Sequence, residues 1–310
     1  MNIIIPTPVT DAMIGAGTSI AEPSASETAW AASTAYSVGD VRIRATTHRK
    51  YRCAVAHTSA ASPAPESDAT RWVDIGPTDR WAPFDSYTNT RALSTASITY
   101  VLNPGYVNAL ALYGLVGAQY SITIKDAPAG ATIYSKTGFL TQDPFGWYEY
   151  LFAATSRIEK LVLTNLPIRP TAEITITVTA ATGQPVGIGM IVLGDFVPLV
   201  GDAAEWGGVQ YGATAEPVTY SYIKTDEFGN TTIVRRHRST NMAANIVLPS
   251  ERTDEALRQI QEVLDVPVAW IAKPNPSGFQ GLNVFGLGSA RVTYESPGLS
   301  RIDLNVKGMI

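Results

Sequence analysis

Three side chains in the first part of the chain are of the types that bind zinc. His48, Cys53 and His57 follow the spacing His-x4-Cys-x3-His, and zinc prefers imidazole and thiolate ligands. Successive side chains on a strand point to opposite faces, so Cys53 and His57 share a face while His48 lies on the other. No second cysteine completes a four-ligand site, and no third group is placed to activate Cys53. We therefore predict no metal site, no disulfide and no cysteine nucleophile.

The acidic residues do not form the pair that a glycan-cleaving enzyme requires. Such enzymes hold two carboxyl groups about 5 to 9.5 Å apart. The candidates fall singly in predicted turns or strands: Asp126, Asp143, Glu149, Glu173 and Asp195. The three histidines, His48, His57 and His237, allow no Ser-His-Asp arrangement. We therefore predict that the chain is not an enzyme and needs no cofactor.

The composition is that of an ordered protein with few charges. Of the 310 residues, 45% are hydrophobic and 16% are charged, against a usual charged share of about 25%. Such a surface is often covered by neighbouring molecules. The net charge of -4 argues against a nucleic-acid partner, which would require a basic stripe. The one basic cluster, residues 235–238, is interpreted as the solvated end of a hairpin strand.

Neither end of the chain and no internal window carries a membrane signal. Met1-Asn2 offers no basic start for a signal peptide, and the apolar run 3–5 stops at Pro6. A membrane helix needs roughly 18 to 20 apolar residues, whereas the run 186–200 is interrupted by glycine, aspartate and proline. We expect a soluble protein without membrane insertion, and its single cysteine is consistent with folding in a reducing cytoplasm.

The chain is organised around residues 97–126, its densest concentration of strand-forming side chains. Residues 98–102 and 120–124 alternate apolar with polar, while 107–115 is a nearly continuous apolar run. This pattern predicts a two-layer β-sandwich whose middle strand is covered on both faces. Further strands are expected at 132–134, 147–152, 160–163, 173–178 and 186–193. The strand 147–152 (WYEYLF) would expose aromatic rings, which a neighbouring subunit, the favoured occupant, or a glycan would cover. Trp147 and Tyr148 are therefore candidate sugar-binding residues.

The remaining parts predict an N-terminal arm and a C-terminal α+β domain. Residues 1–28 contain a short edge strand at 3–5 and too few large side chains for a core, so they should lie on another domain or subunit. Residues 218–223 and 231–238 form a long hairpin around a turn at 226–230. A helix follows, with Ser250 as N-cap and Pro267 as its stop. The hairpin edge should pair with a second copy through Val218, Tyr220, Tyr222, Thr232 and Val234.

An ordered set of residues between Trp30 and Trp72 resembles a known family. The set resembles the small chitin-binding carbohydrate-binding modules of families five and twelve: Trp30, Thr34-Ala35-Tyr36, Gly39-Asp40-Val41, Tyr51-Arg52-Cys53, His57-Thr58-Ser59, Pro65 and Trp72. The resemblance implies a miniature aromatic core and one exposed tryptophan that grips the sugar. That position is Pro63 here, and the loop 59–69 contains no aromatic residue. Tyr36 and Trp72 are left as the module's candidate carbohydrate-binding residues through partial ring faces, although the favoured interpretation places both in its core.

A second resemblance extends over the rest of the chain. Residues 74–126, with DIGPT and RWAPFD, resemble bacteriophage virion proteins found among tail-tip genes. The sandwich is similar to galactose-binding jelly rolls, and 196–310 resembles the split-barrel domain of tail-tube and distal tail proteins. The expected domains are the arm 1–28, the module 29–75, the sandwich 76–195 and the tail-tube-like domain 196–310.

These resemblances imply a structural component of a phage tail, at the tip, baseplate or adaptor region. The alternative is a glycan-binding receptor-recognition protein of the virion, and a glycan-degrading enzyme ranks third. The expected partners are other tail proteins, further copies of the chain in a six-fold or three-fold ring, and a host surface glycan. The protein would be assembled in the host cytoplasm and reside in the virion.

Overall fold

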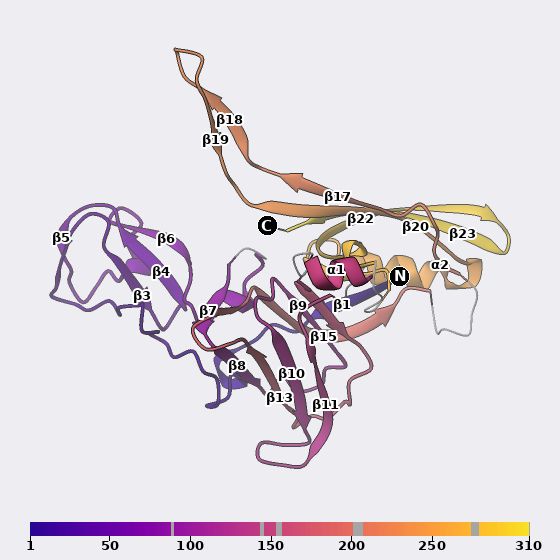
Figure 1. Cartoon of the computed structure of the whole chain (residues 1–310), viewed down its shortest axis with the longest axis horizontal. Coiled ribbons are helices and arrows are strands. Elements are labelled where there is room, and N and C mark those ends of the chain that lie inside the picture. Colours follow the sequence, from indigo (N-terminus) through magenta and orange to yellow (C-terminus); the bar gives the residue numbers. More distant parts are fainter. Residues whose placement is uncertain (88–89, 143–145, 153–156, 201–206, 274–278, 310) are drawn as a thin grey trace.

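The computed structural model describes the whole chain except residues 88–89, 143–145, 153–156, 201–206, 274–278 and 310 (Figure 1). The protein is mainly β, with 48% strand and 10% helix. Its largest element is a ten-stranded sheet with the order β12-β9-β15-β1-β21-β22-β23-β20-β16, and β17 also pairs with β20. The strands are β12 (Lys160–Leu163), β9 (Ala109–Tyr113), β15 (Met190–Pro198), β1 (Asn2–Pro6), β21 (Val268–Ile271), β22 (Asn283–Ser296), β23 (Leu299–Gly308), β20 (Arg238–Pro249), β16 (Gly208–Val209) and β17 (Thr214–Thr219).

The ten-stranded sheet curls into a half-barrel. Tyr113 on β9 and Phe285 on β22 are separated by β15, β1 and β21, yet their ring centroids lie 6.2 Å apart. They contact each other across the concave face, where Ile4, Val192 and Ile271 are also buried. Strands buried on both faces lose the polar alternation of a solvated strand. All five residues of β9 are buried, as the apolar run 107–115 predicts.

Strand β1 lies in the interior of this sheet, so the prediction of an edge strand at residues 3–5 is wrong. It pairs with β15 on one side and with β21 on the other, both antiparallel. Ile3 and Ile4 have no exposed surface. An uninterrupted apolar triplet is typical of a strand with both faces covered, and Pro6 ends it because proline cannot donate to the next ladder position. The start of the N-terminal segment 1–28 therefore belongs to the sheet through β1. The expected domain boundary at 195/196 falls within β15.

A second, four-stranded sheet packs on the other face of β9, β12 and β15. Its order is β11-β10-β13-β8, and the short pair β14-β7 closes the layer. The core between the layers contains Ile98, Tyr100, Ile122, Ile176 and Leu112 among others. The strands are β7 (Ala92–Thr95), β8 (Ser97–Leu102), β10 (Gln119–Lys125), β11 (Thr132–Phe139), β13 (Glu173–Thr179) and β14 (Pro185–Ile188).

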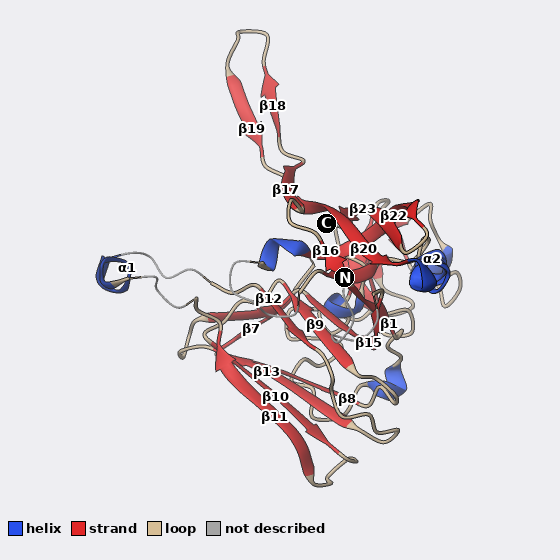
Figure 2. Cartoon of the chain, turned by 90° about the vertical axis from the view of Figure 1, so that its right-hand side faces the viewer, coloured by secondary structure: helices blue, strands red, loops and turns tan. Residues whose placement is uncertain are grey.

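Residues 147–152 form the helix α1 (Trp147–Phe152), so the predicted aromatic strand is wrong. Figure 2 shows α1 apart from both sheets, where no strand edge is available for pairing. Rings spaced three and four residues apart meet on a helix surface. The Trp147 and Tyr150 rings have centroids 6.2 Å apart, and those of Tyr148 and Phe152 are 5.4 Å apart. These local contacts favour the helical turn.

The helix α2 (Thr253–Glu262) covers one face of the C-terminal strands, as predicted. Ala256 and Ile260 pack with Trp270 and Ile302 in one buried cluster. The helix is preceded by a 3-10 turn at Ser250–Arg252, so Ser250 is not its N-cap. The Ser250 hydroxyl instead donates to the Ser296 carbonyl over 3.3 Å. Four other 3-10 turns lie within the described ranges, at Asp11–Met13, Pro65–Ser67, Ala82–Phe84 and Gln280–Leu282.

The module stands to one side of the two sheets in Figure 1. A three-stranded sheet, β3-β4-β6, and a two-stranded one, β2-β5, enclose a small core. Its buried members are Tyr36, Tyr51, Cys53 and Trp72. The strands are β2 (Ala35–Tyr36), β3 (Val41–Arg44), β4 (Arg49–Cys53), β5 (His57–Thr58) and β6 (Trp72–Pro77).

Candidate functional site: a projecting arm and a basic groove

A two-stranded ribbon, residues 220–237, projects from the two packed sheets, which we call the body. This ribbon, and not the N-terminal segment 1–28, is called the arm from here on. Its strands β18 (Tyr222–Thr225) and β19 (Thr231–Val234) pair only with each other among the strands that the structure describes. Both views show it clear of the sheets (Figures 1 and 2). Ile223 and Ile233 are 67% and 64% exposed. The arm therefore presents apolar side chains and two unpaired strand edges to its surroundings.

The structure brings the predicted interface residues together along this hairpin. Tyr222 is opposite Val234, and Lys224 is opposite Thr232. Val218 lies just below the arm, on β17, opposite Ser239. Tyr220, two residues after Val218, donates its backbone N–H to the His237 carbonyl over 3.2 Å.

The arm ends in a turn that Asp226 organises. One carboxylate oxygen of Asp226 accepts backbone N–H groups from Phe228 at 3.0 Å and from Asn230 at 2.7 Å, and the other accepts the Asn230 amide at 3.0 Å. Hydrogen bonds from Asn230 hold the pKa of the Asp226 carboxyl below its usual value. The turn presents Glu227, which is exposed, and Phe228, which is 89% exposed. The tip is therefore acidic with an aromatic ring beside it.

A basic groove lies at the opposite end of the arm, where it joins the body. The groove has a volume of about 990 Å³ and is lined by the arm base, β9, β12 and the end of β23. Glu159 is the one acidic side chain among the groove-lining residues that the structure describes. The basic ones are Arg91, Lys160, Arg235, Arg236, His237 and Arg238.

Most of the groove's cations lack a carboxylate partner in the described part of the chain. No ion pair forms there at Arg91, Arg235 or Arg238. Arg236 lies over the Tyr222 ring, with its guanidinium carbon 4.8 Å from the ring centroid. Like charges held together without counter-charge repel one another, so this groove favours an anionic occupant.

The partly buried Lys160 and the buried Tyr113 line the same groove. The Lys160 ammonium donates to the Asn283 carbonyl at 2.8 Å and to that of Gln280 at 3.4 Å. Burial lowers the pKa of Lys160, against a smaller opposing effect of Glu159. Tyr113 is 3% exposed, and its hydroxyl has no hydrogen-bond partner among the described residues. Buried polar groups normally have partners, so this hydroxyl is a second indication of a ligand.

The prediction that the basic cluster 235–238 is solvated is confirmed, because all four residues are exposed directly after β19. The groove that the cluster also lines was not predicted. Arg91, Lys160 and Tyr113 come from segments far away in the sequence, and only the curled sheet brings them to the arm base. The available signal was the run of basic residues in a chain with a low charged fraction.

Tyr36 and Trp72, the module's candidate sugar-binding residues, are both part of its core. Each is 3% exposed, and their rings meet edge to face with centroids 5.0 Å apart. The Tyr36 hydroxyl donates to the Ala31 carbonyl at 3.0 Å. A sugar binds aromatic rings by their open faces, so neither residue can serve as the platform.

The zinc-type side chains are separated as the strand geometry indicates. Cys53 is buried, and its sulfur lies 3.9 Å from Nδ1 of His57. The ring of His48 lies instead between Asp11 and Glu22, with nitrogen–oxygen distances of 3.0 and 2.9 Å. Within the described residues, no cluster of three histidine, cysteine or acidic side chains could hold a metal ion.

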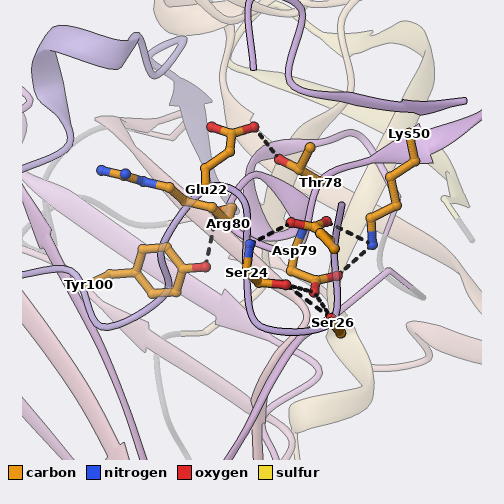
Figure 3. A network of polar contacts seen from close by, with 9 residues as sticks. Glu22, Ser24, Ser26, Lys50, Thr78, Asp79, Arg80 and Tyr100 are labelled. Carbon is orange, nitrogen blue, oxygen red and sulfur yellow. Dashed lines mark hydrogen bonds and ion pairs between the residues drawn. The ribbon is translucent and has the colours of Figure 1, made fainter. Parts of the chain in front are cut away.

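A polar network joins the module to the body (Figure 3). Lys50 of the module contacts Asp79 and, at 3.2 Å, Glu27. Asp79 also accepts the hydroxyls of Ser24 at 2.6 Å and Ser26 at 2.8 Å. Burial alone would raise the pKa of Asp79, but the bonds from Lys50 and the two serines outweigh it and lower the pKa. We call these five residues the joint.

The α1 residues Trp147 and Tyr148 are the most exposed of the candidate sugar-binding residues. Their exposed fractions are 81% and 76%, and Tyr150 beside them is 67% exposed. The predicted aromatic surface therefore exists, although on a helix. Glu149, an acidic candidate of the same segment, has a side chain outside the described set.

The comparisons with known proteins found no relative of this chain. No family model, no curated protein and no solved structure matches the chain. In the part of the chain that the structure describes, no helix has the length and apolar character to cross a membrane. The function must therefore be argued from the surfaces described above.

Proposed function

We propose that the chain is a structural subunit of a bacteriophage tail, at its tip, baseplate or adaptor region, that assembles with other virion proteins and with further copies of itself. The arm is the observation that carries this proposal. It leaves apolar side chains such as Ile223 and Ile233 and two strand edges in solvent. A monomer gains nothing from such a ribbon, whereas a neighbouring subunit can pair with its edges and cover its side chains.

Repetition of one such contact between identical subunits produces a ring. A head-to-tail contact closes when the rotation between copies divides a full turn, and it forms a filament when it does not. Ring assembly also accounts for the low charged fraction, because covered surface needs few solvating groups. We propose a six-fold ring, with three-fold symmetry as the alternative, on the resemblance of residues 196–310 to tail-tube proteins.

The finer fold assignments belong to the same proposal. The half-barrel with α2 on its outer face supports a relationship to the split-barrel domain of tail-tube proteins. The four-stranded sheet packed on β9, β12 and β15 supports a jelly-roll-like sandwich, and the aromatic core of residues 29–75 supports a module related to chitin-binding domains. The boundaries between the proposed domains are less sharp in the structure, because β1 and β15 share one sheet with the C-terminal strands.

Cryo-electron microscopy of intact particles with this protein labelled tests the proposal. We expect a symmetric ring in the tail in which each arm contacts an adjacent copy. A ring whose arms contact only solvent would refute arm-mediated assembly. Particles that lack the protein would refute the structural role altogether.

A second function, glycan recognition at the host surface, is favoured by α1. Its exposed rings offer the flat apolar faces on which sugars stack, and the buried Tyr36 and Trp72 do not. Trp147→Ala should therefore weaken binding of the whole protein to host surface polysaccharide at least about fivefold if this function holds, since a stacked ring contributes about 1 kcal/mol or more. Tyr211→Ala, at another exposed aromatic, is the matched control. Equal binding by both variants and the wild type would exclude α1.

A further inference from the structure

We propose that the acidic tip of one arm binds in the basic groove at the arm base of a second copy of the chain. The contact joins Glu227 and Phe228 of one copy to the groove formed by Arg91, the 235–238 cluster and Lys160 of the next. It rests on the proposed self-assembly and specifies the contact through which assembly occurs.

Charge complementarity is the first support. The tip carries Asp226 and Glu227, and the groove carries its cations around the single acidic Glu159. Asp226 is already engaged in the turn, so Glu227 is the carboxylate free to reach a guanidinium. Arginine pairs with carboxylate through two parallel hydrogen bonds, which fixes orientation as well as attraction.

The groove also offers groups without a partner that an incoming ligand would satisfy. The buried Tyr113 hydroxyl has no partner among the residues that the structure describes. Arg91, Arg235 and Arg238 have no carboxylate from the described part of their own chain. A carboxylate entering the groove would offset this charge, and Phe228 would add apolar contact.

The tip cannot reach the groove of its own copy. The ladder runs without interruption from Tyr222 opposite Val234 to Thr225 opposite Thr231, so the tip and the base are opposite ends of one extended ribbon. Figure 1 shows the turn at the far end from the body. A contact between tip and groove is therefore intermolecular and head-to-tail, which is the geometry that closes rings.

Disulfide trapping with the full chain tests the contact even where association is weak. Thr225→Cys, at the end of β18 beside the tip, and His237→Cys, in the groove, keep Glu227 and the arginines in place. The two proteins are mixed and oxidised over a range of concentrations, and covalent dimer is measured by non-reducing electrophoresis. We expect at least about tenfold more dimer than from the control mixture of Glu251→Cys and Arg258→Cys, which places the cysteines on exposed positions around α2. About 1 M salt should abolish the excess, because it shortens the screening length to about 3 Å. Equal trapping in the two mixtures overturns the proposal.

Charge reversal supplies an independent test of the same contact. Each reversal is added to a protein that keeps its trapping cysteine. Glu227→Arg in the Thr225→Cys protein should stop trapping with His237→Cys, and Arg235→Glu in the His237→Cys protein should stop trapping with Thr225→Cys. Combining the two double variants should restore trapping. Failure of this rescue overturns the proposal. An oligonucleotide that binds the wild type but not Arg235→Glu, with no trapped dimer, would assign the groove to nucleic acid instead.

The outcomes separate this contact from the structural role. If trapping fails while particles show arms against adjacent copies elsewhere, the tail function stands and the tip–groove contact is wrong. If trapping succeeds and particles lack the protein, the contact stands and the tail function is wrong.

Discussion

At the scale of single residues, the joint determines how firmly the module is held on the body. Its five residues come from three segments: Ser24, Ser26 and Glu27 from the first, Lys50 from the second and Asp79 from the third. A charge-assisted hydrogen bond contributes about 1.5 to 3 kcal/mol when it is shielded from water. Asp79 is partly exposed, with 26% of its side chain accessible, so the lower part of that range applies.

We expect Asp79→Asn to lower the free energy of unfolding by about 1 to 2 kcal/mol at neutral pH. The folded-state pKa of Asp79 is lowered from its ordinary 3.8, so its contribution is present above that pH and is lost as the pH falls below it. The difference between variant and wild type should therefore shrink between about pH 4 and pH 2. Urea unfolding followed across this pH range measures it. A constant difference would contradict the assignment.

A glycine on β22 gives a second prediction at this scale. A methyl group on Gly288 would lie 2.2 Å from the ring of Trp270, which is fully buried and donates its indole N–H to the Gly286 carbonyl at 3.1 Å. Forcing the ring aside should make Gly288→Ala less stable by about 1 to 3 kcal/mol. Gly298→Ala, where a methyl group meets nothing within 4 Å, is the control. Equal unfolding midpoints for the two variants would contradict this prediction.

Residue roles were predictable only where neighbours in the sequence define them. The separation of His48 from Cys53 and His57 was predicted from strand alternation, although His48 lies in the turn that precedes β4. The core position of Tyr36 and Trp72 was the favoured interpretation and is confirmed, but an aromatic residue in a small module can also serve as a platform, so residue type alone does not decide it. The groove was not predictable, because Tyr113 and Arg238 meet only through the curled sheet.

At the scale of elements, the arm can be removed at a defined point. Thr219 and Arg238 are paired across β17 and β20, so residues 220–237 can be replaced by Asn-Gly, which favours a two-residue hairpin turn. The arm supplies no member of the four buried clusters, so the melting temperature should change by no more than a few degrees. Self-association and incorporation into particles should be lost. Sedimentation and particle composition measure these, and an arm-less protein that still assembles would contradict the arm's role.

Elements with strong periodicity were predicted well, and locally ambiguous ones were not. Strands β8, β9 and β10 match the pattern of residues 97–126, and α2 matches its apolar stripe. The segment 147–152 was assigned as a strand because aromatic residues favour sheets. It has no partner strand, and its ring pairs at helical spacing decide the outcome.

At the scale of the whole molecule, the sequence predicts an assembly component that carries no hydrolytic activity. The protein should release no product from peptidoglycan, chitin oligomers or lipopolysaccharide, because no carboxylate pair or triad could be assigned from its sequence. Sugar analysis of the reaction supernatant checks this. Release that disappears when one acidic residue is replaced would reverse the prediction.

The interior position of β1 has a consequence for synthesis on the ribosome. β1 is made before its partners β15 and β21, which begin at residues 190 and 268. At a translation rate of about 5 to 20 residues per second, β21 emerges roughly 10 to 50 s after β1. Until β15 emerges, the Ile3-Ile4-Ile5 triplet has both backbone edges open, and the edge that pairs with β21 stays open for the whole interval, as in an aggregation-prone segment. Yield during expression should therefore depend on chaperones that shield the nascent β1 segment, more than on the stability of the finished sheet.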